Sequence, residues 1–189
     1  MIRTMLFAVV AALTMLSVFF GVASADLNFG HRIYSTSTCG GAQKDPVHLM
    51  FWGNGVLSVT LNEFASHVGW SYTDGSTMYF ADHGVCTSQD AQRASAPDYY
   101  WQRGHIRFEY VEYYSPYYYY TIAAAHMDWC YPHVAIDYDY VRDALANAFA
   151  AAGHSVQSRA WSSPGSIWVV CLGDGWYEYF DGNWKLIEL

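Results

Sequence analysis

Apolar residues recur with the spacing of an α-helix in two segments of the chain, and a glycine follows each segment. The first apolar stripe consists of Leu57, Leu61, Phe64, Ala65 and Val68. The second consists of Val141, Leu145, Ala148, Phe149 and Ala152. Because glycine readily adopts the left-handed conformation that closes a helix, we expect Gly69 and Gly153 to end the two helices. Asp137 or Asp139 is the expected N-cap of the second helix.

Other segments show the short apolar runs or the alternation that β-strands require. The predicted strands cover residues 47–52, 77–80, 105–114, 117–128, 132–136, 167–172, 176–180 and 184–187. Gly-Asp-Gly and Asp-Gly-Asn turns separate the last three, which predicts a small C-terminal β-meander. Residues 82–98 have the composition of a loop. The pattern as a whole predicts an α+β fold: a single, mostly antiparallel sheet of five to seven strands with two helices packed on one face.

The two central strands are expected to form a long antiparallel hairpin, because only Ser115 and Pro116 separate residues 105–114 from residues 117–128. So short a link fixes the register of the two strands. The expected cross-strand pairs are His105 with His126, Arg103 with Asp128, and Arg107 with Ala124.

The first 25 residues have the features of an export signal. Arg3 supplies a positive charge, an apolar run extends from Met5 to Val22, and Ala23-Ser24-Ala25 matches a cleavage site. Cleavage would leave residues 26–189 as one secreted or periplasmic domain with no membrane span. The alternative is an uncleaved membrane anchor, because the apolar run approaches the roughly 20 residues that cross a bilayer.

The charge and cysteine content of the chain limit the kinds of partner it can bind and indicate the compartment in which it works. Loss of the signal would leave eight basic residues against 17 acidic ones, and so negative a surface excludes nucleic-acid binding. The four cysteines, an even number in a chain with an export signal, predict two disulfides. Three pairings are open, of which we favour Cys39–Cys86 and Cys130–Cys171. A cysteine metal site is the rival interpretation, but the sequence has no Cys-x-x-Cys pair.

Polar residues that can bind a metal concentrate on and just after the predicted hairpin. The group comprises His105, His126, Asp128, His133, Asp137 and Asp139, with Arg103, Arg107 and Arg142 nearby. Histidines with one carboxylate can hold Zn²⁺ and leave a position for water, so His105, His126, Asp128 and His133 are the candidate ligands of a hydrolytic centre. The competing interpretation is a structural cluster of caps and cross-strand ion pairs. No HExxH motif is present, and under this interpretation no cofactor is expected.

Tyrosine dominates the far end of the hairpin. Outward-facing tyrosines can stack on sugar rings or on a partner protein, although tyrosine is also simply a good strand residue. The candidate binding surface consists of Tyr113, Tyr114, Tyr117 and Tyr118.

Four stretches resemble the C-terminal domain of LssY-type proteins. They are PVHLMFWGNG, FASHVGW, RGHIRFEY and AAAHMDWCYPHVAIDYDYVRDAL, and the resemblance extends from about Pro46 to Gly153. Family members usually follow a membrane-embedded phosphatase-like region, which this sequence lacks, and the cysteines also depart from the family. The resemblance implies a small α+β domain and no particular activity.

The sequence therefore predicts an exported, disulfide-stabilised domain with a non-catalytic binding role in the cell envelope or outside the cell. Its partner would be an envelope component or a protein. The alternative is a metal-dependent hydrolase that uses the histidine and aspartate cluster of the central hairpin, with Zn²⁺ as its cofactor.

Overall fold

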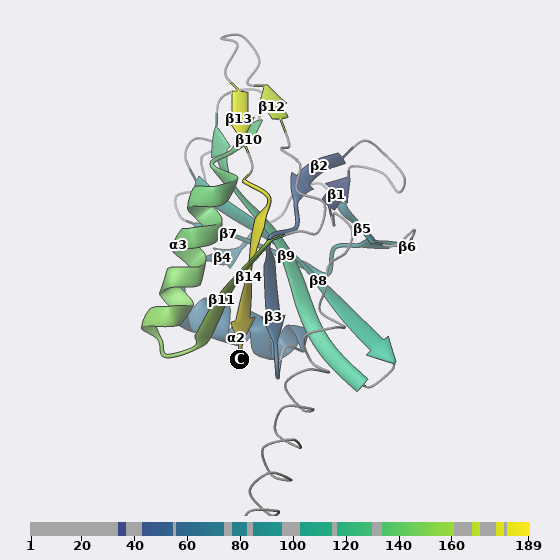
Figure 1. Cartoon of the computed structure of the whole chain (residues 1–189), viewed down its shortest axis with the longest axis vertical. Coiled ribbons are helices and arrows are strands. Elements are labelled where there is room, and N and C mark those ends of the chain that lie inside the picture. The colour runs from purple at the N-terminus through teal and green to yellow at the C-terminus, as the bar shows by residue number, and fades with distance from the viewer. Residues whose placement is uncertain are drawn as a thin grey trace, which may run out of the picture. The chain divides into compact units, whose positions relative to one another are not determined.

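The computed structural model describes residues 34–36, 43–54, 56–73, 77–82, 85–95, 103–114, 117–129, 134–160, 168–170, 177–179 and 181–189. These residues form an α+β fold with two helices, α2 (Leu57–His67) and α3 (Tyr138–Ala151) (Figure 1). The predicted fold class is therefore confirmed. In the described part of the chain, neither helix has the length and apolar character to cross a bilayer.

The larger sheet has the strand order β11-β14-β3-β9-β8-β7-β4, and β10 pairs with β9. In that order the strands are Ser155–Ala160, Asn183–Glu188, Leu49–Trp52, Tyr117–Trp129, Arg103–Tyr114, Ala91–Ala94 and Ser71–Tyr72, with β10 at Val134–Ile136. Only β14 and β3 pair in parallel among the described strands of this sheet. The sheet is thus mostly antiparallel, as the sequence predicted.

The expectation of a single sheet of five to seven strands is wrong, because the described residues form three sheets, the largest with eight strands. A second sheet has the order β2-β1-β5-β6, from Gln43–Pro46, Tyr34–Thr36, Tyr79–Asp82 and Val85–Ser88, and a third pairs β12 (Trp168–Val170) with β13 (Tyr177–Tyr179). The predicted loop at residues 82–98 contains β6 and β7, whose short polar sequences carry no periodic signal. The predicted meander is also wrong, because β14 inserts between β11 and β3 and leaves β12 and β13 as a separate pair.

Both helices pack on one face of the larger sheet, where they bury an apolar core. The core consists of Leu49, Phe51, Phe64, Ile106, Phe108, Ala123, Ala125, Val141, Leu145, Phe149 and Ile187. Gly69 and Gly153 have positive φ angles of 74° and 98° and end the two helices, as expected. Ala65 and Ala152 of the predicted stripes are exposed, whereas Thr60 is buried.

The predicted N-cap of α3 is not formed by a side chain. Asp137 precedes the helix with a left-handed backbone (φ 54°), and its carboxylate makes no capping hydrogen bond. Asp139 lies inside the first turn and instead accepts a hydrogen bond from the backbone N–H of Asp181. The start of α3 is therefore stabilised by a contact with a distant loop, which the local sequence did not indicate.

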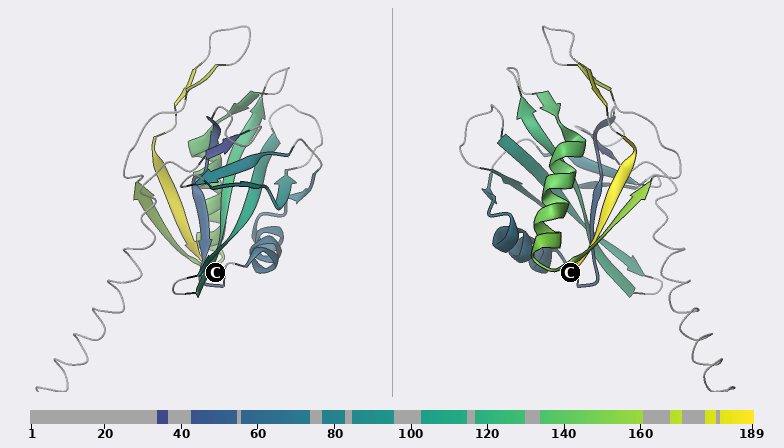
Figure 2. Two further views of the ribbon diagram at one scale, coloured as in Figure 1. Left: turned by 90° about the vertical axis from the view of Figure 1, so that its right-hand side faces the viewer. Right: turned by 60° about the vertical axis from the view of Figure 1, so that its left-hand side comes forward.

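The register of the β8–β9 hairpin is the predicted one, with Arg103 opposite Asp128 and His105 opposite His126. Because strand residues alternate between faces, this register sends the apolar residues towards the helices and the polar ones to the opposite face. Figure 2 shows α3 on one side of the larger sheet and the sheet of β1, β2, β5 and β6 on the other. The polar residues of the hairpin are thereby enclosed between two sheets.

Some predictions fall on residues outside the described part. They concern the signal at residues 1–25, His133, Cys39, Cys130 and Cys171; Cys86 lies on β6, but its side chain is not described. The disulfides and the export signal therefore stay predictions.

Candidate functional site

Three of the four predicted metal ligands meet on the polar face of the hairpin. His105 on β8 and His126 and Asp128 on β9 each present one ligand atom, and these atoms lie within 4.8 Å of one another. The two imidazoles are perpendicular, with ring centroids 5.2 Å apart. None of the three residues is more than 2% exposed. The sequence therefore located this cluster correctly, and the enclosing second sheet explains its burial.

Asp128 is the centre of the cluster, and both of its oxygens accept a hydrogen bond. Arg103 Nε donates to Oδ2 at 2.7 Å, and His126 Nε2 donates to Oδ1 at 3.0 Å. Burial alone would raise the pKa of Asp128, but these two donors outweigh it and hold the pKa well below its usual range. Asp128 is thus ionised, with both of its oxygens engaged by protein donors.

His105 is neutral in this setting. Its Nε2 donates to Gln92 Oε1 at 3.1 Å, and its Nδ1 lies 3.9 Å from Asp128 Oδ1, too far for a hydrogen bond. Among the described residues Nδ1 has no hydrogen-bond partner. Burial, reinforced by the nearby charge of Arg107, lowers the pKa of His105 to about 2.

Asp45, from β2 of the second sheet, covers the cluster on the polar face of the hairpin. Its carboxylate accepts a hydrogen bond from the Tyr138 hydroxyl at 3.1 Å and lies 3.4 Å from Arg107 Nη1 and 3.7 Å from His126 Nδ1. His48, just before β3, lies beside this group: its ring is 6.5 Å from that of Tyr138, and its Nε2 accepts the backbone N–H of Ala125 at 3.2 Å. Burial lowers the pKa of His48 to about 3. The network therefore joins both sheets and the start of α3.

The charges of this network do not favour a cation. Two guanidinium groups, Arg103 and Arg107, flank the potential ligands, and the Asp128 carboxylate is already engaged by two donors. A metal ion would have to displace His126 from Asp128 and sit beside buried positive charge, which costs free energy. The arrangement matches the structural alternative, in which buried charges are paired and hydrogen-bonded.

The remaining members of the predicted group lie elsewhere. Arg142 forms a bidentate pair with Asp181, at 2.7 and 3.1 Å, and also binds Asp139 and Asp143, each at 2.9 Å. Burial raises the pKa of Asp139 to about 6 against the opposing effect of Arg142. Asp137 is exposed. Arg142 and Asp139 fasten α3 to the segment before β14, and none of the three residues contributes a ligand to the hairpin cluster.

The predicted binding surface lies at the end of the hairpin. β3 pairs with β9 only at residues 121–123, and β7 pairs with β8 only at residues 105–108. Residues 111–114 and 117–120, which we call the tyrosine arm, therefore pair only with each other among the described strands. Six of these eight residues are tyrosine. Figure 1 shows the ends of β8 and β9 diverging from β3.

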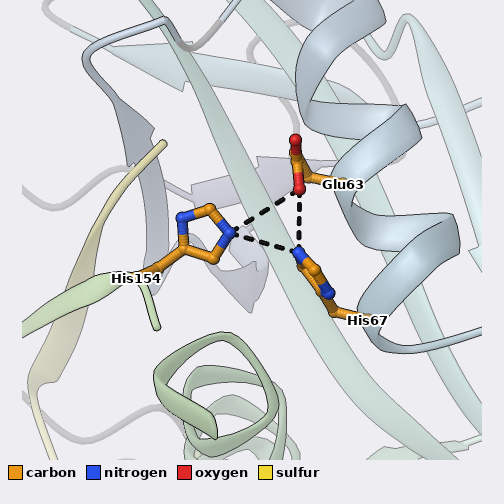
Figure 3. Close-up of side chains that lie close together, drawn as sticks. All are labelled: Glu63, His67 and His154. Atoms are coloured by element: carbon orange, nitrogen blue, oxygen red, sulfur yellow. Dashed lines mark hydrogen bonds and ion pairs between the residues drawn. The ribbon is translucent and has the colours of Figure 1, made fainter. Parts of the chain in front are cut away.

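The structure also assembles a second group of ligand residues that the sequence analysis did not identify. Glu63 and His67 come from α2, and His154 follows α3 (Figure 3). The Glu-x-x-x-His spacing on a predicted helix was a local signal for the first two. Nothing local pointed to His154, because it is 87 residues from His67.

Comparison of the chain with protein-family models, with curated proteins and with solved structures finds no match. The resemblance to the LssY-type C-terminal domain therefore stays a prediction, and function has to be argued from the residues themselves.

Proposed function

We propose that this protein is an exported, disulfide-stabilised binding domain without catalytic activity, and that it holds an envelope polysaccharide or a partner protein through the tyrosine arm. Export follows from the signal features of residues 1–25, and the four cysteines supply two disulfides.

The observation that supports this proposal is the extension of the tyrosine arm beyond its neighbouring strands. A two-stranded ribbon is only marginally stable by itself in water. Tyrosine combines a large apolar ring with a polar hydroxyl, which suits it to sugar rings and to protein interfaces. An arm of this composition has most to gain from a bound partner.

The buried cluster supports a structural role and not a catalytic one. At most 2% of His105, His126 or Asp128 is exposed, so a substrate would need the second sheet to move away. The carboxylate that would serve as a base or a ligand already accepts two hydrogen bonds. The cluster gives the two sheets a defined polar interface and leaves binding to the arm.

Retention on insoluble cell-wall polysaccharides and on immobilised envelope proteins tests the proposal. The variant Tyr117→Ala/Tyr118→Ala removes two adjacent tyrosines of the arm. We expect it to unfold at the same temperature as the parent protein but to be washed from the matrix. The matched control is Tyr140→Ala, which removes a 69% exposed tyrosine of α3 and should leave retention unchanged. Equal retention of the double variant and the parent protein would refute the proposal.

The metal-dependent hydrolase is the second candidate, because three of its four predicted ligands do converge. Metal analysis of the purified protein separates the two candidates. Stoichiometric zinc that disappears in His126→Ala, together with loss of a hydrolytic activity, would favour the enzyme over the binding domain.

A further inference from the structure

We propose that Glu63, His67 and His154 form a binding site for Zn²⁺ that is separate from the buried cluster and leaves one coordination position open to water. The three side chains come from different parts of the chain. Glu63 and His67 are one turn apart on the last part of α2, and His154 directly follows Gly153, whose positive φ ends α3. Figure 3 shows the three side chains pointing at a common centre.

The distances between the three ligand atoms fit a tetrahedral ion. His67 Nε2 lies 2.8 Å from Glu63 Oε2 and 3.2 Å from His154 Nε2, and His154 Nε2 lies 3.6 Å from Glu63 Oε2. Zinc with bonds of about 2.0–2.1 Å holds its ligand atoms roughly 3.3–3.4 Å apart. A point about 2.05 Å from all three atoms lies roughly 0.8 Å from their plane, close to the roughly 0.7 Å of a regular tetrahedron.

The tautomer of His154 is set for ligation. Its Nδ1 donates to the backbone carbonyl of Glu188, on β14, at 3.1 Å. Nε2 of the neutral ring is therefore unprotonated and directs its lone pair towards His67. A backbone carbonyl that orients the distal nitrogen is the usual outer contact of a zinc-bound histidine.

Hydrogen bonds alone leave this group incompletely satisfied. Two acceptor atoms, Glu63 Oε2 and His154 Nε2, lie within 3.2 Å of His67 Nε2. A single proton on His67 Nε2 can form a full hydrogen bond with only one of them. A cation at the centre would satisfy all three lone pairs together. Among the described residues, Glu63 pairs with no lysine or arginine, so no fixed positive charge opposes a cation as in the buried cluster.

The site combines a rigid floor with access from solvent. Phe149, fully buried in the core, contacts both imidazoles, with ring centroids 5.5 Å from those of His67 and His154. The ligand side chains remain 18–37% exposed, so an ion can enter and keep a water molecule in the fourth position. Two imidazoles and one carboxylate around such a position suit Zn²⁺.

Calorimetric titration of the purified protein with ZnCl₂, after removal of metals with a chelator, tests the proposal. We expect one zinc ion per chain. We also expect a higher unfolding temperature in the presence of zinc, because the ion would join α2 to the segment after α3. Each of the variants Glu63→Gln, His67→Ala and His154→Ala should weaken zinc binding by more than about 100-fold. All three positions are partly exposed, and circular dichroism checks that the variants fold.

Glu188→Gln is the matched control, since it removes the exposed carboxylate of the residue whose backbone carbonyl orients His154 but keeps that carbonyl. It should bind zinc like the parent protein. The proposal is overturned if the parent protein binds no zinc, if the three variants bind it undiminished, or if the ion is lost in His126→Ala and not in His154→Ala. The last result would locate the metal in the buried cluster.

Discussion

Replacement of Asp128 by asparagine tests whether the buried cluster is structural. Asparagine keeps the volume of the side chain, so no cavity forms, but it removes the charge that both Arg103 and His126 contact. The side-chain nitrogen of asparagine is a donor, so it would face a second donor, either Arg103 Nε or His126 Nε2. Arg103, only 7% exposed, would lose its ion pair with Asp128.

The expected cost follows from these contacts. A hydrogen bond to a charged group contributes about 1.5–3 kcal/mol, and removal of one partner from a buried ion pair costs about 3–5 kcal/mol. We therefore expect Asp128→Asn to lower the free energy of unfolding by about 3–5 kcal/mol, a large fraction of the roughly 5–15 kcal/mol of a typical domain. Arg103→Met/Asp128→Asn should lose less than the sum of the two single variants, because each single variant already loses the same Arg103–Asp128 contact.

Urea unfolding followed by tryptophan fluorescence and circular dichroism measures this difference, with the slope of the transition unchanged. The control is Asp143→Asn, whose carboxylate also binds an arginine but is 46% exposed, so its loss should cost no more than about 1 kcal/mol. If Asp128→Asn costs as little as the control, the cluster contributes little to the stability of the fold. The case for a functional role of His105 and His126 would then become the stronger one.

Two further predictions concern the same sheet. Burial raises the pKa of Glu109 from 4.5 to about 7 despite a hydrogen bond with Thr87, so the folded state favours the protonated acid. The free energy of unfolding should therefore fall by up to about 3 kcal/mol as the pH rises from about 4.5 through 7. Urea titrations at successive pH values measure this slope, and Glu109→Gln should abolish it. An unchanged slope in the variant would show that other groups cause the pH dependence. Gly104→Ala should lower the free energy of unfolding by at least about 2 kcal/mol, because the new methyl group would collide with the indole of Trp70, which packs edge-on against Phe64. A thermal unfolding curve like that of the parent protein would show that Trp70 can move aside.

Features that depend on neighbouring residues were predictable. The two-residue link at Ser115 and Pro116 fixed the pairing of His105 with His126, and Gly69 and Gly153 marked the ends of the helices. Hydrophobic periodicity located both helices, since one face of each had to meet the sheet. It was less accurate at the edges of the stripe, where Ala65 is exposed and Thr60 is buried.

Features that depend on distant segments were not predictable. Strands β6 and β7 have short, polar sequences and become strands because partners at β5 and β8 accept their hydrogen bonds. The second sheet brings Asp45 over the hairpin cluster, and this decides that the cluster is sealed from solvent. No local pattern contains that information, because burial is a property of the packed chain.

The sequence by itself determined the register of the hairpin, and with it the meeting of two imidazoles and one carboxylate on one face. The tertiary structure alone decided which histidines are accessible. Local rules act through backbone geometry over a few residues, whereas the group of Glu63, His67 and His154 exists only because α2, the turn after α3 and the C-terminal strand pack around Phe149.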